Sequence, residues 1–349
     1  MDPAQLYHLL HNPLFKEPEM SEQLRWKKYH PLSDQNAFIC LVNWMGNDSS
    51  IVQAARVSYN KDDRGDEQAT LQSIRENCTK GGPEVTEDIC KQYSALVDEE
   101  KARRDRNLIR YLMNHQHTTP FEMVEVQFMV QVPMDCWRQW VRHRTANINE
   151  YSTRYTEALD FFQVTDPAEW RLQSTDNKQG SSGFLVKCTG TEEIDGEFLT
   201  VEEEQFHVHA KRVYQNRLHS GVAKEQARKD LPLSTYTRAY WKCDLHNIFN
   251  FLRLRMDSHA QLEIRSFANC MFEIVKQLFP VSCEAFEDYV LHAKKFSRME
   301  MELIRDFIQT QPCNRNPKEI VAYSVDTHNY KPSTMTDREW KEFLAKLGT

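Results

Sequence analysis

The chain has 349 residues, of which 40% are apolar and 27% charged, and its formal net charge is −7. This length accommodates one large domain or two ordinary ones, and the composition is typical of a globular protein. The acidic balance argues against a general nucleic-acid binder, and no window approaches the roughly eighteen apolar residues of a membrane helix. Residues 1–20 lack the pattern of a secretory signal, and nine cysteines without a CxxC pair favour reduced thiols in the cytoplasm.

The first half of the chain mixes strand and helix patterns. In order, we expect an N-terminal extension at 1–36, a strand at 37–45, a helix at 50–59, a charged surface insertion at 61–100, a helix at 100–114, a nonhelical segment at 115–122 and a strand at 123–132. The last strand is the clearest, because Val124, Val126, Phe128, Val130 and Val132 alternate with polar residues. A half-buried strand gives this pattern, and Pro133 is expected to end it.

The second half is mainly helical. We expect helices at 134–144, 200–220 with a continuation at 222–230, 246–279 and 284–309, a loop at 174–183, and a C-terminal helix with a capping box from Thr336 to Glu339. These elements predict an α/β (α+β) fold with mixed strands and long helices. The expected organisation is a single catalytic domain at 37–290 followed by a C-terminal helical extension at 291–349.

Residues 137–155 hold an unusual density of cations: four arginines and His143. On a helix Arg138 and Arg142 would lie one turn apart, whereas Arg142 and Arg144 would diverge by about two hundred degrees. Beyond the helix, Glu150, Ser152 and Arg154 alternate, so an extended chain would point them to one side. The segment predicts a site for a small anion. The alternative is a surface laced with weak salt bridges, for which few acidic partners lie nearby in sequence.

A second polar set interrupts the apolar pattern at 246–279. Asn250, Arg255 and His259 lie there, with Arg255 and His259 one helical turn apart. Burying a guanidinium without a partner is costly, so Arg255 either reaches Asp257 or Glu263 or faces a cleft. No glycine-rich phosphate motif occurs, and a phosphorylated ligand would therefore rely on arginines and helix N-termini.

These residues resemble the flavin-dependent thymidylate synthase family. Its signature is Arg-His-Arg, seven residues and Ser, which here is Arg142-His143-Arg144, TANINEY and Ser152. Further blocks resemble the family in the same order: IVQAARVSY, RNLIRYLMNHQHTTPFE, RQWVRHR, NEYSTRY, LPLSTYTR and NFLRLRMDSHAQLEI. They span roughly residues 37–287, interrupted by the insertion at 61–100.

The resemblance implies an enzyme that converts dUMP to dTMP. Methylenetetrahydrofolate would donate the carbon, reduced FAD the hydride, and NADPH would recharge the flavin. The resemblance also implies a homotetramer with active sites between subunits. No metal, nucleic-acid polymer or membrane is implied as a partner.

The resemblance also carries residue roles. The positions that resemble dUMP contacts are Gln139, Trp140, Val141, Arg142, Glu150, Tyr151, Ser152, Thr153, Arg154, Arg228 and Arg255. Glu150, Ser152 and Arg154 would contact the nucleotide from a neighbouring subunit, with Tyr151 and Thr153 acting through the main chain. The positions that resemble FAD contacts are Thr119, Glu122, Arg142, His143, Arg144, Glu150, Asp244, His246, Asn250 and His259. Arg255 resembles the catalytic arginine that polarises the pyrimidine, and His117 the histidine near the folate.

Some residues depart from the family pattern. Asp244 and His246 stand where the family more usually has Asn and Arg, and Thr153 replaces a frequent glycine. Ser152 has no neighbouring histidine to activate it, so we expect it to donate or accept hydrogen bonds rather than act as a nucleophile. The alternative to an enzyme is a non-catalytic nucleotide- or RNA-binding module built on the arginine-rich segment. A metal site at His207 and His209 is disfavoured, because their side chains diverge on a helix.

Overall fold

The computed structural model describes residues 23–58, 87–175, 180–185, 195–310 and 337–347. The chain divides into two compact units, residues 1–290 and 291–349. Most of the segment expected as a surface insertion, 61–100, lies outside the described residues. Its C-terminal part does not form a separate insertion, because helix α5 (Glu87–Asn114) begins within it, thirteen residues earlier than the predicted start at 100.

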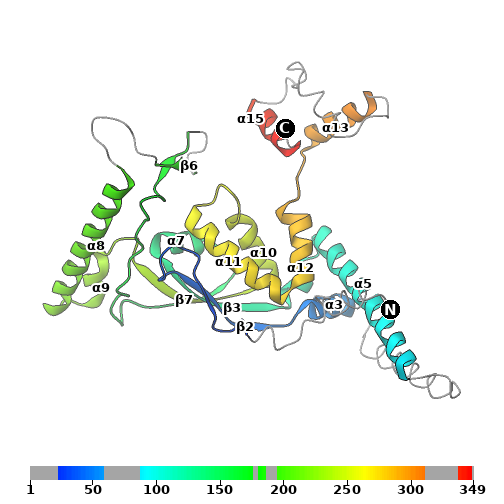
Figure 1. The fold of residues 1–349 in the computed structure, drawn as a ribbon, viewed down its shortest axis with the longest axis horizontal. Helices are drawn as coiled ribbons and strands as arrows, with labels where there is room; N and C mark the ends of the chain where they lie inside the picture. The colour runs from blue at the N-terminus through cyan, green and yellow to red at the C-terminus, as the bar shows by residue number, and fades with distance from the viewer. Residues whose placement is uncertain (1–22, 59–86, 176–179, 186–194, 311–336, 348–349) are drawn as a thin grey trace. The chain divides into compact units, whose positions relative to one another are not determined.

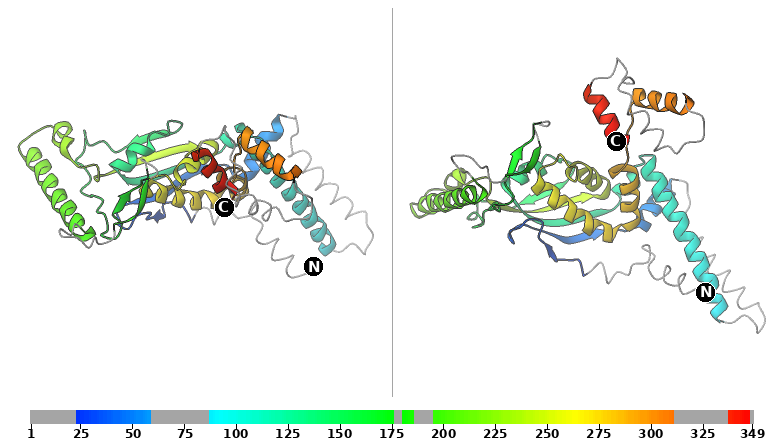
Figure 2. Two further views of the ribbon diagram at one scale, coloured as in Figure 1. Left: turned by 90° about the horizontal axis from the view of Figure 1, so that it is seen from above. Right: turned by 45° about the horizontal axis from the view of Figure 1, so that its top comes forward.

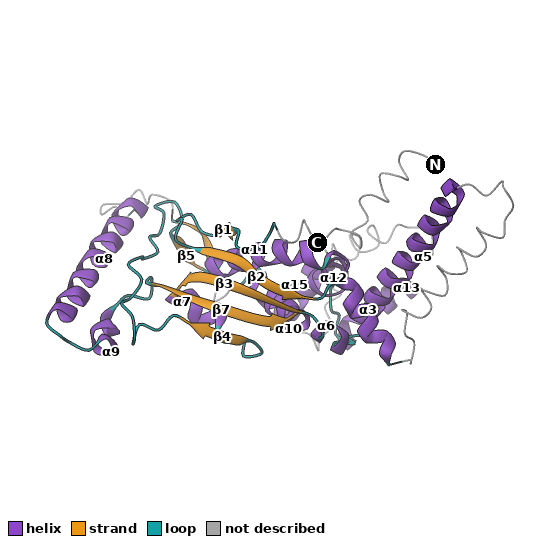
Figure 3. Ribbon diagram, turned by 90° about the horizontal axis from the view of Figure 1, so that it is seen from below, coloured by secondary structure: helices purple, strands orange, loops and turns teal. Residues whose placement is uncertain are grey.

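A five-stranded antiparallel sheet organises the first unit, in the order β1-β2-β3-β7-β4. Its strands are β1 (Lys28–Tyr29), β2 (Phe38–Met45), β3 (Glu125–Pro133), β7 (Tyr236–Asp244) and β4 (Asn147–Glu150). The strands predicted at 37–45 and 123–132 are confirmed as β2 and β3. The five alternating apolar residues at 124–132 are all fully buried, so the α+β class is confirmed, with an antiparallel sheet that Figure 3 shows face on.

Strand β7 is absent from the predicted elements, although it lies between β3 and β4 and pairs with both. Its inward residues Ala239, Trp241 and Cys243 are buried, whereas Tyr240 and Lys242 project from the other face. This period-two alternation is a strand pattern. The polar residues Arg238 and Lys242 weaken the apolar pattern of this strand. Its hydrogen-bonded pairing with β3 on one side and β4 on the other is what stabilises it.

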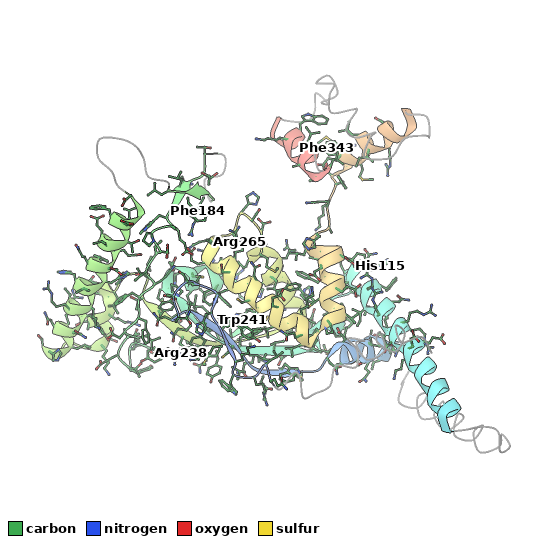
Figure 4. The ribbon with its side chains drawn as sticks, viewed as in Figure 1. His115, Phe184, Arg238, Trp241, Arg265 and Phe343 are labelled. Carbon is green, nitrogen blue, oxygen red and sulfur yellow. The ribbon has the colours of Figure 1, made fainter. Side chains whose placement is uncertain are left out.

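Four helices cover one face of the sheet: α7 (Met134–Trp140), α10 (Leu245–Arg255), α11 (Leu262–Leu278) and α12 (Pro280–Phe286) (Figure 1). Trp241 projects from β7 toward these helices (Figure 4). Its ring centroid lies 5.9 Å from that of Trp140 on α7 and 5.4 Å from that of Phe251 on α10. Buried aromatic contacts of this kind fix the helices on the sheet.

Two predicted helices end earlier than expected. The helix predicted at 134–144 stops at Trp140, so Arg142 and Arg144 lie in the following turn and the helical angle between them does not apply. The pattern at 246–279 forms two helices rather than one, α10 and α11, separated by residues 256–261. Asp257 stabilises the break, because its carboxylate accepts the main-chain N–H of His259 at 2.8 Å. His259 therefore lies in a loop and not one turn from Arg255.

Further helices lie at the two ends of the sheet (Figure 2). At one end are α3 (Asp48–Val57), α5 and the short helix α6 (Thr119–Glu122), which corrects the nonhelical prediction for 115–122. At the other are the helix α8 (Gly196–His219), the short helix α9 (Lys224–Ala227) and the 3-10 turn η2 (Arg228–Asp230). The helix predicted to continue at 222–230 is interrupted, because Gly221 adopts a left-handed φ of 79°.

The loop predicted at 174–183 is partly a hairpin, with β5 (Arg171–Gln173) paired to β6 (Ser181–Phe184). None of the helices in the described ranges combines the length and apolarity that a membrane crossing requires.

The second unit contains α13 (Arg298–Thr310) and α15 (Asp337–Leu347). The single helix predicted at 284–309 is wrong, because α12 ends at Phe286, a π-helical turn η3 (Glu287–Leu291) follows, and α13 starts only at Arg298. Phe343 is buried beside Phe296 and Trp340 (Figure 4). The carboxylate of Glu300 accepts from Lys346 at 2.7 Å. The predicted capping box begins at Thr336, outside the described residues.

Asp48 joins the start of α3 to the start of α12. Its buried carboxylate accepts the main-chain N–H groups of Val281 and Ser282 at 2.9 and 3.0 Å and the Ser282 hydroxyl at 2.5 Å. Burial raises the pKa of Asp48 to about 6, and these hydrogen bonds oppose that rise only in part. Because the folded pKa exceeds the value of about 3.9 in unfolded chains, protonated Asp48 is favoured by folding.

We expect this stabilisation to be complete below about pH 4 and to be lost as the pH rises through about 6. The difference in unfolding free energy between wild type and Asp48→Asn should therefore shrink by about 2 kcal/mol between pH 4 and pH 7, at about 1.4 kcal/mol per pKa unit. Urea unfolding at a series of pH values measures this difference. A difference that stays constant across this window would contradict the assignment.

Candidate active site

The arginine-rich segment leaves the sheet-covering helix α7 and forms the edge strand β4. Arg138, Arg142 and Arg144 are exposed. None of the three forms an ion pair with a carboxylate within the described part of the chain. The salt-bridged surface considered as an alternative is therefore not observed for these three cations, and their charge is available to an anion.

His143, between two exposed arginines, points the other way. It is buried, with its ring 5.6 Å from Phe251 and 6.1 Å from Trp241, and its Nε2 hydrogen-bonds with the Thr145 hydroxyl at 3.1 Å. Burial, and next the charge of Arg255, lowers the pKa of His143. The imidazole is thus a neutral core group, and the turn exposes the main chain and the neighbouring arginines instead.

Arg255 ends α10 and lies beside the end of α7. Its Nη2 donates to the main-chain carbonyl of Gln139 at 3.0 Å. Neither acidic partner proposed from the sequence pairs with Arg255: the Asp257 carboxylate accepts from His259 at 2.8 Å, and the Glu263 carboxylate from Arg171 at 2.6 Å. Burial lowers the pKa of the half-buried Arg255. Among the described residues no carboxylate forms an ion pair with Arg255, so its positive charge next to Gln139 is suited to stabilising negative charge on a ligand.

The segment after β4 is a turn and not an extended chain, which corrects the expected alignment of Glu150, Ser152 and Arg154. The main-chain N–H of Tyr155 donates to the Ser152 carbonyl at 3.1 Å. Glu150, on the strand, accepts from the Thr237 hydroxyl at 2.8 Å, whereas Arg154 approaches Glu225 of α9 at 3.4 Å. The three side chains therefore contact different elements.

Arg228 closes this turn from the other side. Its Nη1 donates to the Thr153 hydroxyl at 2.5 Å, and Lys224 donates to the Tyr155 carbonyl at 3.2 Å. Thr153, where the family has a frequent glycine, thus holds Arg228 through its side chain. The main-chain N–H of Tyr151 is already bonded to the Arg238 carbonyl at 2.7 Å, which leaves only its carbonyl for a ligand.

Three further candidates are occupied by local contacts. Asp244 caps α10 by accepting the Asn247 N–H at 2.9 Å, and Asn250 accepts from Arg253 at 3.0 Å. The side chain of His259 is 72% exposed and bonded to Asp257. His246 is half-buried at the start of the same helix, and nothing further distinguishes it.

The short helix α6 packs against α10 and so brings Thr119 and Glu122, both exposed, toward the element that carries Asn250 and Arg255. Just before it, His117 lies in an exposed group with Tyr111 and His115, with ring centroids 5.9 and 6.4 Å from that of His117. These rings form an aromatic surface at the end of α5.

Two candidates next to Gln139 contribute differently from expectation. The Trp140 side chain is fully buried, and Val141 is the C-cap of α7. Only the main chain of Trp140 is suited to contact a ligand, whereas the side chain of Val141 is partly exposed. Gln261, whose side chain bonds that of Gln139, is not among the residues predicted for the site. The family-like block NFLRLRMDSHAQLEI contains it and is the signal that could have indicated it.

The two histidines considered for a metal do not converge. Nε2 of His207 bonds the Ser234 hydroxyl at 2.7 Å, whereas His209 bonds Arg212 at 2.9 Å. Over the described residues, no group of three or more histidine, cysteine or acidic side chains is arranged to hold a metal ion.

Solved structures share this architecture. The chain is similar to a structure described as a UMP/dUMP methylase, PolB from Streptomyces cacaoi, bound with 5-Br dUMP, with a TM-score of 0.56 and 29% identity. The similarity covers 74% of this chain and 97% of that one. The chain therefore shares its α+β fold with a nucleotide methylase.

Comparison of the sequence identifies the protein family. The sequence model of the thymidylate synthase complementing protein family matches residues 40–281. The chain is 48% identical to a protein named flavin-dependent thymidylate synthase from Dictyostelium discoideum, over 67% of this chain and 74% of the relative. It is 38% identical to a protein of the same name from Wolbachia pipientis wMel, over 89% of this chain and 90% of the relative. The chain belongs to the flavin-dependent thymidylate synthase family. This membership favours the enzyme over the non-catalytic nucleotide- or RNA-binding module.

Proposed function

We propose that the chain catalyses the reductive methylation of dUMP to dTMP, with methylenetetrahydrofolate as carbon donor and reduced FAD, recharged by NADPH, as hydride source. The observation that supports it best is the uncompensated charge of Arg255 beside Gln139. Adding a carbon at C5 of uracil requires negative charge to build up on the ring. A fixed guanidinium at the oxygen that receives this charge lowers the barrier.

The nucleotide is proposed to lie between α7 and α10 of one subunit and the turn at 151–155 of another. Arg255 faces the base, whereas Arg228, held by Thr153, and Arg154 supply positive charge for the phosphate. A phosphate would compete with Glu225 for Arg154, and this exchange costs little because the pair is exposed. Ser152 is proposed as a hydrogen-bonding residue: its hydroxyl accepts the Arg154 N–H at 3.4 Å, and no histidine bonds to it among the described residues.

The residues present suit a flavin dinucleotide. Arg142 and Arg144 are exposed cations without carboxylate partners within the described ranges, as a diphosphate requires, and the neutral His143 between them adds no further charge. When bound, the flavin supplies the hydride that completes the methyl group. The proposed contacts are Arg142, Arg144, the main chain at His143, and Thr119, Glu122, Glu150, Asn250, His246 and His259. Asp244 serves first as the cap of α10.

The folate is proposed to stack against the aromatic surface that contains His117. Tyr111 is 51% exposed and its ring is stacked on that of His115 at 4.1 Å, so this surface presents accessible aromatic rings. A homotetramer in the cytoplasm, with sites between subunits, completes the proposal. The exposed edge strand β4, with Ile148 40% exposed beside the arginines, is suited to a subunit contact.

The purified protein should be yellow and show a flavin absorption spectrum that NADPH bleaches under anaerobic conditions. With dUMP and methylenetetrahydrofolate added, dTMP should accumulate, as measured by chromatography. Omission of dUMP is the control, and it should leave NADPH bleaching intact while abolishing dTMP. A colourless protein that cannot be reconstituted with FAD would sink the proposal.

A further inference from the structure

A chain of hydrogen bonds runs from Asp135 to Gln139 through Gln261. The Gln261 Nε2 donates to Asp135 Oδ2 at 3.1 Å, and the Gln261 Oε1 accepts from Gln139 Nε2. Gln261 stands at the N-cap position of α11, but its side chain makes no capping hydrogen bond. We call Asp135, Gln261 and Gln139 the amide relay, since the side chain of Gln261 is devoted to linking the other two.

The relay has a fixed direction. A carboxylate only accepts hydrogen bonds, so Asp135 requires the NH₂ end of the Gln261 amide. The carbonyl end of Gln261 must then face Gln139, and it accepts only from the NH₂ end of the Gln139 amide. The opposite end of the Gln139 amide, the acceptor Oε1, is thereby turned away from Gln261. The charge on Asp135 thus determines which atom Gln139 offers to a ligand.

The free end of Gln139 lies at the proposed base site. Gln139 is half-buried, and its Oε1 is neither among the buried atoms nor hydrogen-bonded to any described residue. The main-chain carbonyl of the same residue accepts from Arg255. The proposed base site therefore contains a guanidinium donor from Arg255 and an amide acceptor from Gln139.

This donor–acceptor pair matches one pyrimidine and not the other. Uracil presents the carbonyl O4 next to an N3–H donor, whereas cytosine presents an amino group next to an N3 acceptor. We propose that Asp135 and Gln261 are positioning residues that orient Gln139 so that the site accepts a uracil nucleotide and rejects a cytosine nucleotide. The proposal rests on the proposed function in taking the ligand to be dUMP. Opposing Gln139 Oε1 to the cytosine N3 acceptor leaves both without a donor, which carries an energetic penalty.

Two substitutions abolish the fixed donor-to-acceptor direction of the amide relay and leave Gln139 in place. Asp135→Asn keeps the shape but offers either an NH₂ or a carbonyl to Gln261, so the relay can reverse. Gln261→Met keeps the length of the side chain and abolishes both hydrogen bonds. The matched control is Gln277→Met on the same helix, because Gln277 is exposed and bonds only the Glu273 carbonyl, at 2.9 Å.

The experiment measures dissociation constants of dUMP and dCMP by calorimetry on the full-length, flavin-loaded protein. The two nucleotides share their sugar and phosphate, so their ratio reports the base alone. Wild type and the control should bind dUMP more tightly than dCMP. In each relay variant the ratio of the two dissociation constants should fall about tenfold, because roughly one oriented hydrogen bond is lost. A purely structural role would weaken both nucleotides equally and leave the ratio unchanged.

The outcomes separate the relay from the reaction. A relay variant that keeps the wild-type ratio would overturn the relay, as would a wild type that binds both nucleotides equally or neither. Formation of dTMP by wild type is measured in parallel. If the relay variants lose the preference for dUMP but the wild type forms no dTMP, the relay is supported and the proposed function is contradicted. If the variants keep the preference for dUMP and the wild type forms dTMP, the proposed function is supported and the relay is contradicted.

Discussion

Replacing Arg255 with alanine should slow dTMP formation by about 10²- to 10³-fold, the usual effect of removing one oriented charge-stabilising donor. The side chain is half-buried, has no carboxylate partner among the described residues, and is held by the Gln139 carbonyl at 3.0 Å. Its position is therefore fixed before a ligand arrives. Single-turnover measurement of dTMP after mixing the reduced enzyme with dUMP and methylenetetrahydrofolate isolates this step.

Flavin content provides the internal check, because Arg255 is not among the proposed flavin contacts. The variant should bind FAD at near wild-type stoichiometry. Arg255→Lys should recover only part of the rate, since a lysine keeps the charge but not the planar geometry of the guanidinium. Arg212→Ala, an exposed arginine on α8, serves as the control. Wild-type turnover in Arg255→Ala would remove its assigned role.

Trp140→Ala should lower the unfolding free energy by about 3–5 kcal/mol, the usual cost of deleting a large aromatic side chain from a core. Trp140 is fully buried, and its ring lies 4.9 Å from that of Phe251 and 5.8 Å from that of Phe267. It thereby joins α7 to α10 and α11. Urea unfolding followed by circular dichroism measures the change.

The matched substitution is Trp26→Ala, because Trp26 is 55% exposed. That variant should lose less than about 1 kcal/mol, as surface substitutions usually do. Equal losses at the two positions would show that the Trp140 cluster is not the structural core of the site. Trp140→Phe should fall between them, since phenylalanine fills part of the volume and removes an indole N–H that has no hydrogen-bond partner.

Local patterns predicted the elements whose stability depends on one buried face. The strand at 37–45 was predicted because it is a short apolar run, and the strand at 123–132 because its apolar residues alternate. Strand β7 carries a weaker alternation, and only its pairing with β3 and β4 makes it the centre of the sheet. The end of α7 at Trp140 and the break at 256–261 depend on turns and contacts that no periodicity contains.

The same division holds for the candidate site. By itself, the sequence determined which residue types gather there: the arginines around His143, the conspicuous Arg255 and the family-like blocks that contain them. Only the tertiary structure decided which of these groups are free. Asp257 and Glu263 are bonded to His259 and Arg171, His143 lies in the core, and Arg255 is left uncompensated. The reason is physical: whether a charge is paired depends on groups distant in sequence, and spacing along the chain does not report them.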